Sequence, residues 1–297
     1  MTNNNIKKYD ETAFKVIGYA FITVCTVLAI LPFYLLVMAS FTDEQALYQT
    51  GLSLWPSKFS TVAYNLIFSS PEKLIGGYKI SLTVTAIGTI AGVFLTAMSA
   101  YVLNCKGFKY RNAVAFFFYF TTLFGAGMVP SYIWISSYLH MKNTLAVLII
   151  PGLLNVFNII MLRNFVKSIP DEIMESGKID GAGDFTIFFK LYLPLMKSGL
   201  ACIGLFIGLS YWNNWANAML YVDDEKLFPL QYLLYRMTSS TEGAADAVSS
   251  SGVSVAEMPS QSLKYAMTLV TVLPVVFVYP FVQKHFVRGI TVGAVKG

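Results

Sequence analysis

The chain has 297 residues, of which 56% are apolar or aromatic and only 12% are charged. A soluble globular protein carries roughly twice that share of charged residues, so the composition excludes a water-soluble domain. The lipid bilayer is therefore the expected solvent of this chain.

Six long stretches of the sequence contain no Asp, Glu, Lys or Arg. Each is long enough to cross a bilayer as a helix, which needs about 20 residues. A charge at the bilayer centre costs roughly 2.5–3.5 kcal/mol, which explains why such stretches stay uncharged. They predict an all-α membrane protein with six transmembrane helices, folded as a single transmembrane domain over residues 1–297. The stretches are Val16–Thr42, Ile80–Asn104, Asn112–Met141, Asn143–Leu162, Ser198–Val222 and Tyr265–Gln283.

The basic residues predict which loops face the cytoplasm. Of the 21 Lys and Arg residues, 14 lie before the first stretch, after the second, after the fourth or after the sixth. Loops rich in Lys and Arg remain on the cytoplasmic side. Both termini are therefore predicted to be cytoplasmic, in the inner (cytoplasmic) membrane. The net charge of +5 reflects this topology, so no nucleic-acid partner is predicted.

Two longer loops, 43–78 and 223–264, then lie outside. In the second loop, Leu227–Met237 has a helix-forming composition, and the Ser/Gly/Ala-rich run Thr238–Val255 is predicted to be mobile. The acidic trio Asp223, Asp224 and Glu225 is interpreted as a solvated surface, with contact to a binding protein as the alternative.

The loop 163–197 is inside in this topology and reads as folded protein. The sequence Ser168-Ile169-Pro170-Asp171 has the form of a helix start, with a hydroxyl able to cap and a proline in the first turn. It predicts a short helix from about residue 169 to 178. Gly181 and Gly183 then permit a sharp turn, and Asp184 is placed to cap a second short helix.

That second helix carries an apolar stripe. Phe185, Phe188, Phe189 and Tyr192 follow the i, i+3, i+4, i+7 spacing of one helical face, and Pro194 ends the element. An apolar stripe outside the bilayer must be buried against something. Two interpretations stay open: the stripe packs on the ends of the chain's own spans, or it docks into a partner subunit.

The same loop resembles the cytoplasmic signature of ABC-importer permeases, a Glu-Ala-Ala…Gly sequence ending in Leu-Pro. The match lies at Glu175, Asp180, Gly181, Ala182 and Pro194, while Ser176 and Gly177 replace the usual alanines. In that family the loop forms a coupling helix seated in a cleft of the ATPase subunit. The resemblance therefore implies a cytoplasmic coupling helix between the fourth and fifth spans. Its implied ATPase contacts are Glu175, Ser176, Gly177, Asp180, Gly181, Ala182, Phe185, Phe188 and Pro194.

Further segments are similar to the carbohydrate branch of that family, typified by the maltose transporter, and to oligosaccharide permeases of the LplC/YtcP type. This resemblance implies import of a carbohydrate, an oligosaccharide, with three kinds of partner: a second homologous permease, an ABC ATPase dimer and an extracytoplasmic solute-binding protein. The segments are Phe124-Gly125-Ala126-Gly127-Met128-Val129-Pro130, Tyr211-Trp212-Asn213-Asn214-Trp215, Phe228-Pro229-Leu230-Gln231, Tyr279-Pro280-Phe281 and Gly293-Ala294-Val295-Lys296-Gly297.

No catalytic or cofactor site is predicted in the chain itself. It contains no Gly-x-x-x-x-Gly-Lys-Ser/Thr phosphate loop, so ATP and Mg²⁺ are expected on the partner ATPase. No nucleophile–base pair, paired carboxylates or metal cluster indicates a membrane enzyme. The cysteines Cys25, Cys105 and Cys202 lie far apart with only two histidines in the chain, which argues against a metal site or a disulfide framework.

A polar and aromatic cluster late in the fifth stretch is the candidate sugar pathway. Aromatic faces stack on pyranose rings and amides bond hydroxyls, but an aromatic belt at the membrane interface explains the tryptophans equally well. The candidate residues are Tyr211, Trp212, Asn213, Asn214 and Trp215, together with Asn155 and Asn158 in the fourth stretch, whose alternative role is bonding between helices. The alternatives for function are ABC import of a non-sugar solute and a secondary transporter. The latter is disfavoured because no stretch has an ionisable residue in its interior.

Overall fold

The computed structural model describes residues 2–69, 71–239 and 261–294, and most of these residues are helical. Within the described ranges there is no strand, only an isolated antiparallel bridge between Thr42 and Phe59. The helical class predicted from the sequence is therefore confirmed. From residue 240 on, the run Thr238–Val255 that was predicted to be mobile lies outside the described residues.

The chain divides into two compact units, Met1–Ser70 with Met237–Val270, and Pro71–Arg236 with Thr271–Gly297. The first contains α1 (Thr2–Ser40), α2 (Glu44–Thr50), α3 (Val62–Ser69) and the first turns of α15 (Gln261–Ala294). In this unit the Glu44 carboxylate accepts hydrogen bonds from the backbone N–H groups of Gln261 and Ser262, both at 2.8 Å. It thereby caps the start of α15.

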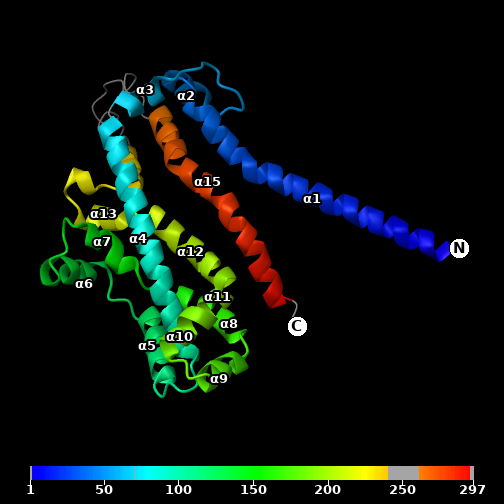
Figure 1. The fold of residues 1–297 in the computed structure, drawn as a ribbon. Coiled ribbons are helices and arrows are strands. Elements are labelled where there is room, and N and C mark those ends of the chain that lie inside the picture. The colour runs from blue at the N-terminus through cyan, green and yellow to red at the C-terminus, as the bar shows by residue number, and fades with distance from the viewer. Residues whose placement is uncertain (1, 70, 240–260, 295–297) are drawn as a thin grey trace. The chain divides into compact units, whose positions relative to one another are not determined.

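The second unit is organised around three packed helices, α4 (Pro71–Asn104), α8 (Val156–Lys167) and α12 (Lys197–Trp212) (Figure 1). Where α4 meets α12, glycines let the two backbones approach. A Cβ atom on Gly208 would lie 3.3 Å from the Thr89 hydroxyl, and one on Gly92 would lie 3.2 Å from Ile207. Small residues at such contacts are the usual means by which membrane helices pack closely.

Among the described residues, three helices are long and apolar enough to cross a membrane: Phe14–Ser40, Pro71–Asn104 and Gln261–Val278. The other three predicted spans each correspond to a pair of helices that meet at a bend. Arg111–Leu123 and Met128–Tyr138 meet at 114°, Leu145–Gly152 and Val156–Lys167 at 50°, and Asp184–Leu195 and Lys197–Trp212 at 83°.

The breaks have local causes. Gly127 has a φ angle of +84°, which other residues rarely adopt, and it separates α5 (Arg111–Leu123) from α6 (Met128–Ile133) and η1 (Trp134–Tyr138). A Cβ on Gly127 would meet nothing within 4 Å, so close helix packing does not explain this glycine. Pro151 lies at the junction of α7 (Leu145–Ile149) and η2 (Ile150–Gly152), where its missing N–H interrupts the α-helical ladder.

The predicted outer loops contain more helix than expected. Besides α2 and α3, the loop predicted at 43–78 includes the first turns of α4, which begins at Pro71, a favoured first position for proline. In the second loop a 3₁₀ turn, η4 (Glu225–Leu227), precedes a helical segment over residues 230–239. This helix begins after Pro229, three residues later than the predicted start at Leu227.

Candidate functional site

The loop 163–197 forms two helical elements at the end of α4 that carries Asn104 (Figure 1). The first is α9 (Asp171–Ile179). The second runs without a gap through α10 (Asp184–Ile187), η3 (Phe188–Tyr192) and α11 (Leu193–Leu195). Gly181 makes the turn between them with a φ angle of +75°, which favours glycine. One residue, Met196, separates the second element from α12.

The predicted caps of these helices are wrong. The Ser168 hydroxyl donates a hydrogen bond of 2.7 Å to the Phe165 carbonyl at the end of α8, and Pro170 precedes α9. Asp184 is the first residue of α10, after Gly183 at the cap position. The acidic side chains therefore lie in the first turns, where they complement the helix dipole instead of capping.

The aromatic stripe is divided between the interior and the surface. Phe188 and Tyr192 are buried, and their rings lie 5.3 and 5.0 Å from the ring of Tyr101 on α4. Phe185 is 72% exposed and Phe189 46% exposed. The segment from Phe188 is π-helical, and its wider turn changes which residues share a face. Phe188 and Tyr192 therefore pack on the chain's own span, and Phe188, which was predicted as an ATPase contact, is only 3% exposed.

Gly177 is buried where α9 packs on the second element. A Cβ atom there would lie 3.0 Å from Leu191 and 3.1 Å from Ile187. Close packing on the inner side of α9 therefore explains why position 177 needs a small residue. Of the other predicted contacts in the loop, Ala182 is half-buried and Pro194 is exposed within α11.

The outer side of the two elements forms an exposed surface that we term the turn face. Its two large apolar side chains, Ile179 and Phe185, are 86% and 72% exposed on either side of Gly181. Such side chains, projecting from an element that is otherwise anchored in the core, suit insertion into a partner. The sequence pattern did not single out Ile179, because one apolar residue beside a turn has no periodicity. The polar members of the face are Glu175, Ser176 and Asp180, all exposed.

At the other end of α12, Tyr211 and Trp212 belong to the interior. The Tyr211 hydroxyl donates a hydrogen bond of 2.7 Å to the carbonyl of Ile149, and the Trp212 indole N–H donates one of 3.2 Å to the carbonyl of Thr271. Both side chains are 5% exposed. Their polar atoms are thus used to hold the helices together.

The next three residues lie at the surface, between α12 and α13 (Ala216–Tyr221). The side-chain oxygen of Asn214 accepts a hydrogen bond of 3.1 Å from the N–H of Asn217 in the first turn of α13. Asn213 accepts a hydrogen bond of 3.0 Å from the side chain of Gln231, and Trp215 stacks on Tyr235 with ring centroids 4.2 Å apart. Gln231 and Tyr235 were not among the predicted site residues, although their i, i+4 spacing could have placed them on one helix face.

The two asparagines of the fourth predicted span lie at its break. Asn155 caps α8, with its side-chain oxygen 3.3 Å from the N–H of Asn158. Asn158 is 8% exposed, so it faces the interior of the chain. This capping hydrogen bond explains why an asparagine lies at position 155, so no contact with a substrate is needed to explain it.

The acidic trio has structural partners within the second unit. Asp223 pairs with Lys142 at 2.9 Å, and Asp224 caps η4 by accepting a hydrogen bond from the N–H of Lys226. Glu225 pairs with Lys73 at 3.1 Å. Pairing with Asp223 raises the pKa of Lys142, and the hydrogen bond from Lys73 lowers the pKa of Glu225. The trio therefore ties neighbouring loops together.

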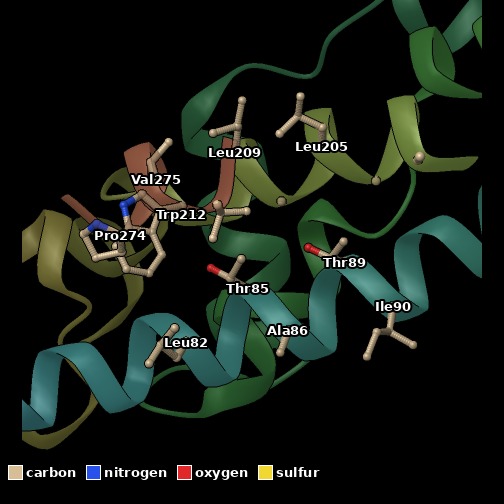
Figure 2. A pocket seen from close by; sticks show the side chains of 14 residues that line it. Leu82, Thr85, Ala86, Thr89, Ile90, Leu205, Leu209, Trp212, Pro274 and Val275 are labelled. Atoms are coloured by element: carbon tan, nitrogen blue, oxygen red, sulfur yellow. The ribbon is translucent and has the colours of Figure 1, made fainter. Parts of the chain in front are cut away.

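A cavity of about 560 Å³ lies between α4, α12 and α15, with Trp212 and Pro274 at one end (Figure 2). Its lining is almost entirely apolar. Thr85 and Thr89 supply hydroxyls that are enclosed and have no hydrogen-bond partner in the described part of the chain. A carbohydrate carries many hydroxyls, each of which must be hydrogen-bonded when buried. This cavity therefore suits an apolar occupant, and the polar surface around Asn213 and Trp215 suits a sugar better.

Comparison with known proteins gives relatives along the whole chain, although no protein-family model matches it. It is 37% identical, over 96% of its length and 98% of the relative's, to the polygalacturonan/rhamnogalacturonan transport system permease protein YtcP of Bacillus subtilis (strain 168). It is 35% identical to Protein LplC of the same strain, covering 91% of this chain and 90% of LplC. Among solved structures it is similar to a bacterial ABC transporter involved in the import of the acidic polysaccharide alginate. There the TM-score is 0.78 and the identity 27%, over 93% of this chain and 98% of that chain.

Proposed function

This chain belongs to the permease subunits of carbohydrate ABC transporters, and from that premise we propose that it forms half of a membrane pathway importing an oligosaccharide. The chain is a membrane protein and a transport subunit. In the proposed assembly the other half is a second, homologous permease. A dimer of ABC ATPases binds ATP and Mg²⁺ and supplies the energy, and an extracytoplasmic solute-binding protein delivers the sugar.

Counting each bent helix pair as one span gives six spans, and we propose this count for the protein. With an even number of spans both termini lie on one side. The distribution of Lys and Arg makes that side the cytoplasm, in the inner membrane. The turn face then lies in the cytoplasm, between the fourth and fifth spans, which is the side where ATP is available.

The exposure of Ile179 and Phe185 at the turn face is the observation that carries this proposal. Both side chains are largely uncovered by the described part of the chain, and both lie outside the helices that are apolar enough to cross a membrane. A cleft on the ATPase would bury them, with Glu175, Ser176 and Asp180 at the polar rim. Gly181, with its positive φ angle, makes the turn between the two elements that carry these side chains.

The same geometry supplies a mechanism for coupling. Phe188 and Tyr192 fix the second element on Tyr101 of α4, and Met196 joins it to α12. Movement of the turn face, driven by closure of the ATPases on ATP, therefore displaces α4 and α12 together as levers. Close packing of these helices transmits the displacement to the end of α12 at Trp212, next to Trp215.

At that end we propose Asn213 and Trp215, with Gln231 and Tyr235, as the contacts of this subunit with the sugar. Amide groups and stacked aromatic rings are the side chains that bind hydroxyls and pyranose faces. Tyr211, Trp212 and Asn214 position this surface through their hydrogen bonds to Ile149, Thr271 and Asn217. Asn155 and Asn158 hold the break between α7 and α8.

Site-specific photo-crosslinking in native membranes tests the coupling proposal. A photoreactive amino acid at position 179 or 185 is expected to cross-link to an ABC ATPase subunit. The matched control is position 117 on α5, which is 61% exposed in an apolar surface and is expected to give no ATPase cross-link. If positions 179 and 185 capture no ATPase while the protein is folded and active, the turn face is not the coupling surface.

A further inference from the structure

A polar cavity of about 280 Å³ lies where the end of α4, the start of α5, the end of α8 and the start of α9 meet. Its lining is unusual in charge. Four of the lining side chains are cationic and Asp171 is the one carboxylate among them, which leaves a net charge of three positive. The cations are Lys106, Arg111, Arg163 and Lys167.

Most of this positive charge has no partner within the protein. Lys106 is paired with Asp171, and this pairing raises the pKa of Lys106, so its ammonium group stays charged. Within the described parts of the chain, no carboxylate lies within ion-pair distance of Arg111, Arg163 or Lys167. The Nε atom of Arg163 is enclosed and lacks a hydrogen-bond partner among the described residues.

Helix stability alone does not account for this cluster. One cation in the last turn complements the dipole of α8, and Lys167 fills that role. Arg111 lies at the opposite, N-terminal end of its own helix, where the dipole disfavours a cation. Three uncompensated cations around one small cavity repel each other, and an anion between them removes that repulsion. Guanidinium and ammonium groups together are the usual ligands of a phosphate.

We propose that this cavity binds the phosphate headgroup of an anionic phospholipid. The surface next to it fits the rest of the lipid. Arg111 begins α5, a helix with no buried residue, and Phe116, Phe117 and Phe120 on this helix are 67%, 61% and 43% exposed. Acyl chains can lie along these rings while the headgroup occupies the cavity. Basic pockets between membrane helices on the cytoplasmic side are a known setting for such lipids.

If the proposed function holds, the lipid has a role in coupling. Asp171 is the first residue of α9 and lines the cavity, so the headgroup lies at the joint between the spans and the turn face. Occupation of the cavity would stiffen this joint. An anionic membrane is therefore expected to give more import per ATP hydrolysed than a zwitterionic one.

Lipid binding to the purified full-length chain is the first test. Native mass spectrometry in mild detergent would compare retention of phosphatidylglycerol with that of phosphatidylcholine, for the wild type and for Arg111→Gln and Lys167→Gln. Loss of one cation is expected to weaken phosphatidylglycerol binding about five-fold. Lys109→Gln is the matched control, because Lys109 is an exposed cation of the same region that does not line the cavity.

Each outcome decides the proposal. Equal weakening in all three variants, or none in any of them, would contradict a specific headgroup site. Inorganic phosphate that competes as strongly as the lipid would identify a free-anion site instead. Transport is a separate measurement: a complex that imports sugar but retains no phosphatidylglycerol rejects only this inference. A chain that retains the lipid while its assembled complex imports no carbohydrate rejects only the proposed function.

Discussion

The phenol ring of Tyr211 lies directly against the backbone of Gly88 on the neighbouring helix. A Cβ atom at position 88 would come within 2.5 Å of two ring carbons. The Tyr211 hydroxyl meanwhile bonds the carbonyl of Ile149, which is free because the N–H of Leu153 bonds Ile150 instead. The Tyr211 ring thus fills the groove between α4 and α12, and its hydroxyl supplies the donor that the Ile149 carbonyl lacks at the helix break. A backbone carbonyl buried away from water requires such a donor.

Gly88→Ala is therefore expected to destabilise the protein by about 1–3 kcal/mol, the range for overpacking a close contact. The ring is rigid and its hydroxyl is bonded, so it cannot move aside freely. Thermal unfolding of the purified protein in detergent measures the effect. Gly76→Ala is the control on the same helix, since its Cβ would meet nothing within 4 Å. Equal unfolding temperatures for the two variants would contradict the packing argument.

Tyr211→Phe separates a structural role from a transport role. Removing the hydroxyl leaves the carbonyl of Ile149 without its donor and is expected to cost about 1 kcal/mol of stability. The KM for the imported sugar should not change. Trp215→Ala, in contrast, is expected to raise KM, in addition to the stability lost with its stacking on Tyr235. A raised KM in Tyr211→Phe would place its hydroxyl in the sugar pathway.

Gly181→Val tests the turn that presents the turn face. The positive φ angle at position 181 costs a residue with a side chain roughly 1–2 kcal/mol, and a β-branched residue fits there worst. The turn is expected to change shape, so that ATP hydrolysis continues while sugar uptake falls. Gly183→Ala is the matched control, because Gly183 has an ordinary φ angle of −71° and open space around it. Full uptake by Gly181→Val would contradict the role of the turn.

Phe185 and Phe188 are expected to respond differently to truncation. Phe188→Ala removes a buried ring packed on Tyr101 and should cost about 3–5 kcal/mol of stability. Phe185→Ala should leave the unfolding temperature nearly unchanged and weaken co-purification of the ATPase. The unfolding temperature and the amount of co-purified ATPase should be measured for both variants. A lower unfolding temperature in Phe185→Ala would mean that this ring packs within the chain and is not available to a partner.

The ion pairs of Glu225 predict a pH dependence. The hydrogen bond from Lys73, with a smaller contribution from Arg236, holds the pKa of this carboxyl below its usual value. Its stabilising contribution is therefore present above the unfolded pKa of about 4.3 and is lost as the pH falls through the lower folded value. The effect is small and weakened by salt, because the groups are exposed. Glu225→Gln should remove this part of the acid-induced decrease in unfolding temperature, and an unchanged decrease would contradict the pairing.

The sequence predicted the apolar segments well because bilayer insertion depends on composition. It did not predict their breaks, which arise from single residues such as Gly127 and Pro151 acting with the surrounding packing. The helical element over residues 184–195 was also predicted incompletely, because the periodicity placed Phe185 and Phe188 on one face. The π-helical turn divides them, and no spacing in the sequence signals it.

The hydrogen-bond partners of Tyr211 and Trp212 could not be predicted from the sequence either. Tyr211 and Trp212 look like a sugar-binding pair beside Asn213 and Trp215, yet their partners, Ile149 and Thr271, lie about 60 residues away along the chain. Only the packing of α12 against the α7–η2 break and α15 shows that the first two residues are internal. The loop 163–197 differs in this respect, because Asp180, Gly181 and Phe185, which the resemblance implied as ATPase contacts, are exposed.

Uptake of labelled oligosaccharides into proteoliposomes tests the central claim most directly. The complex purified with this chain would be supplied with its binding protein, ATP, and fragments of polygalacturonan, rhamnogalacturonan or another polysaccharide. We expect at least one of these to be imported and to stimulate ATP hydrolysis, with no uptake when the ATPase or ATP is omitted. Uptake by this chain without ATP, or an ATP-driven complex that carries only non-carbohydrate solutes, would contradict the account.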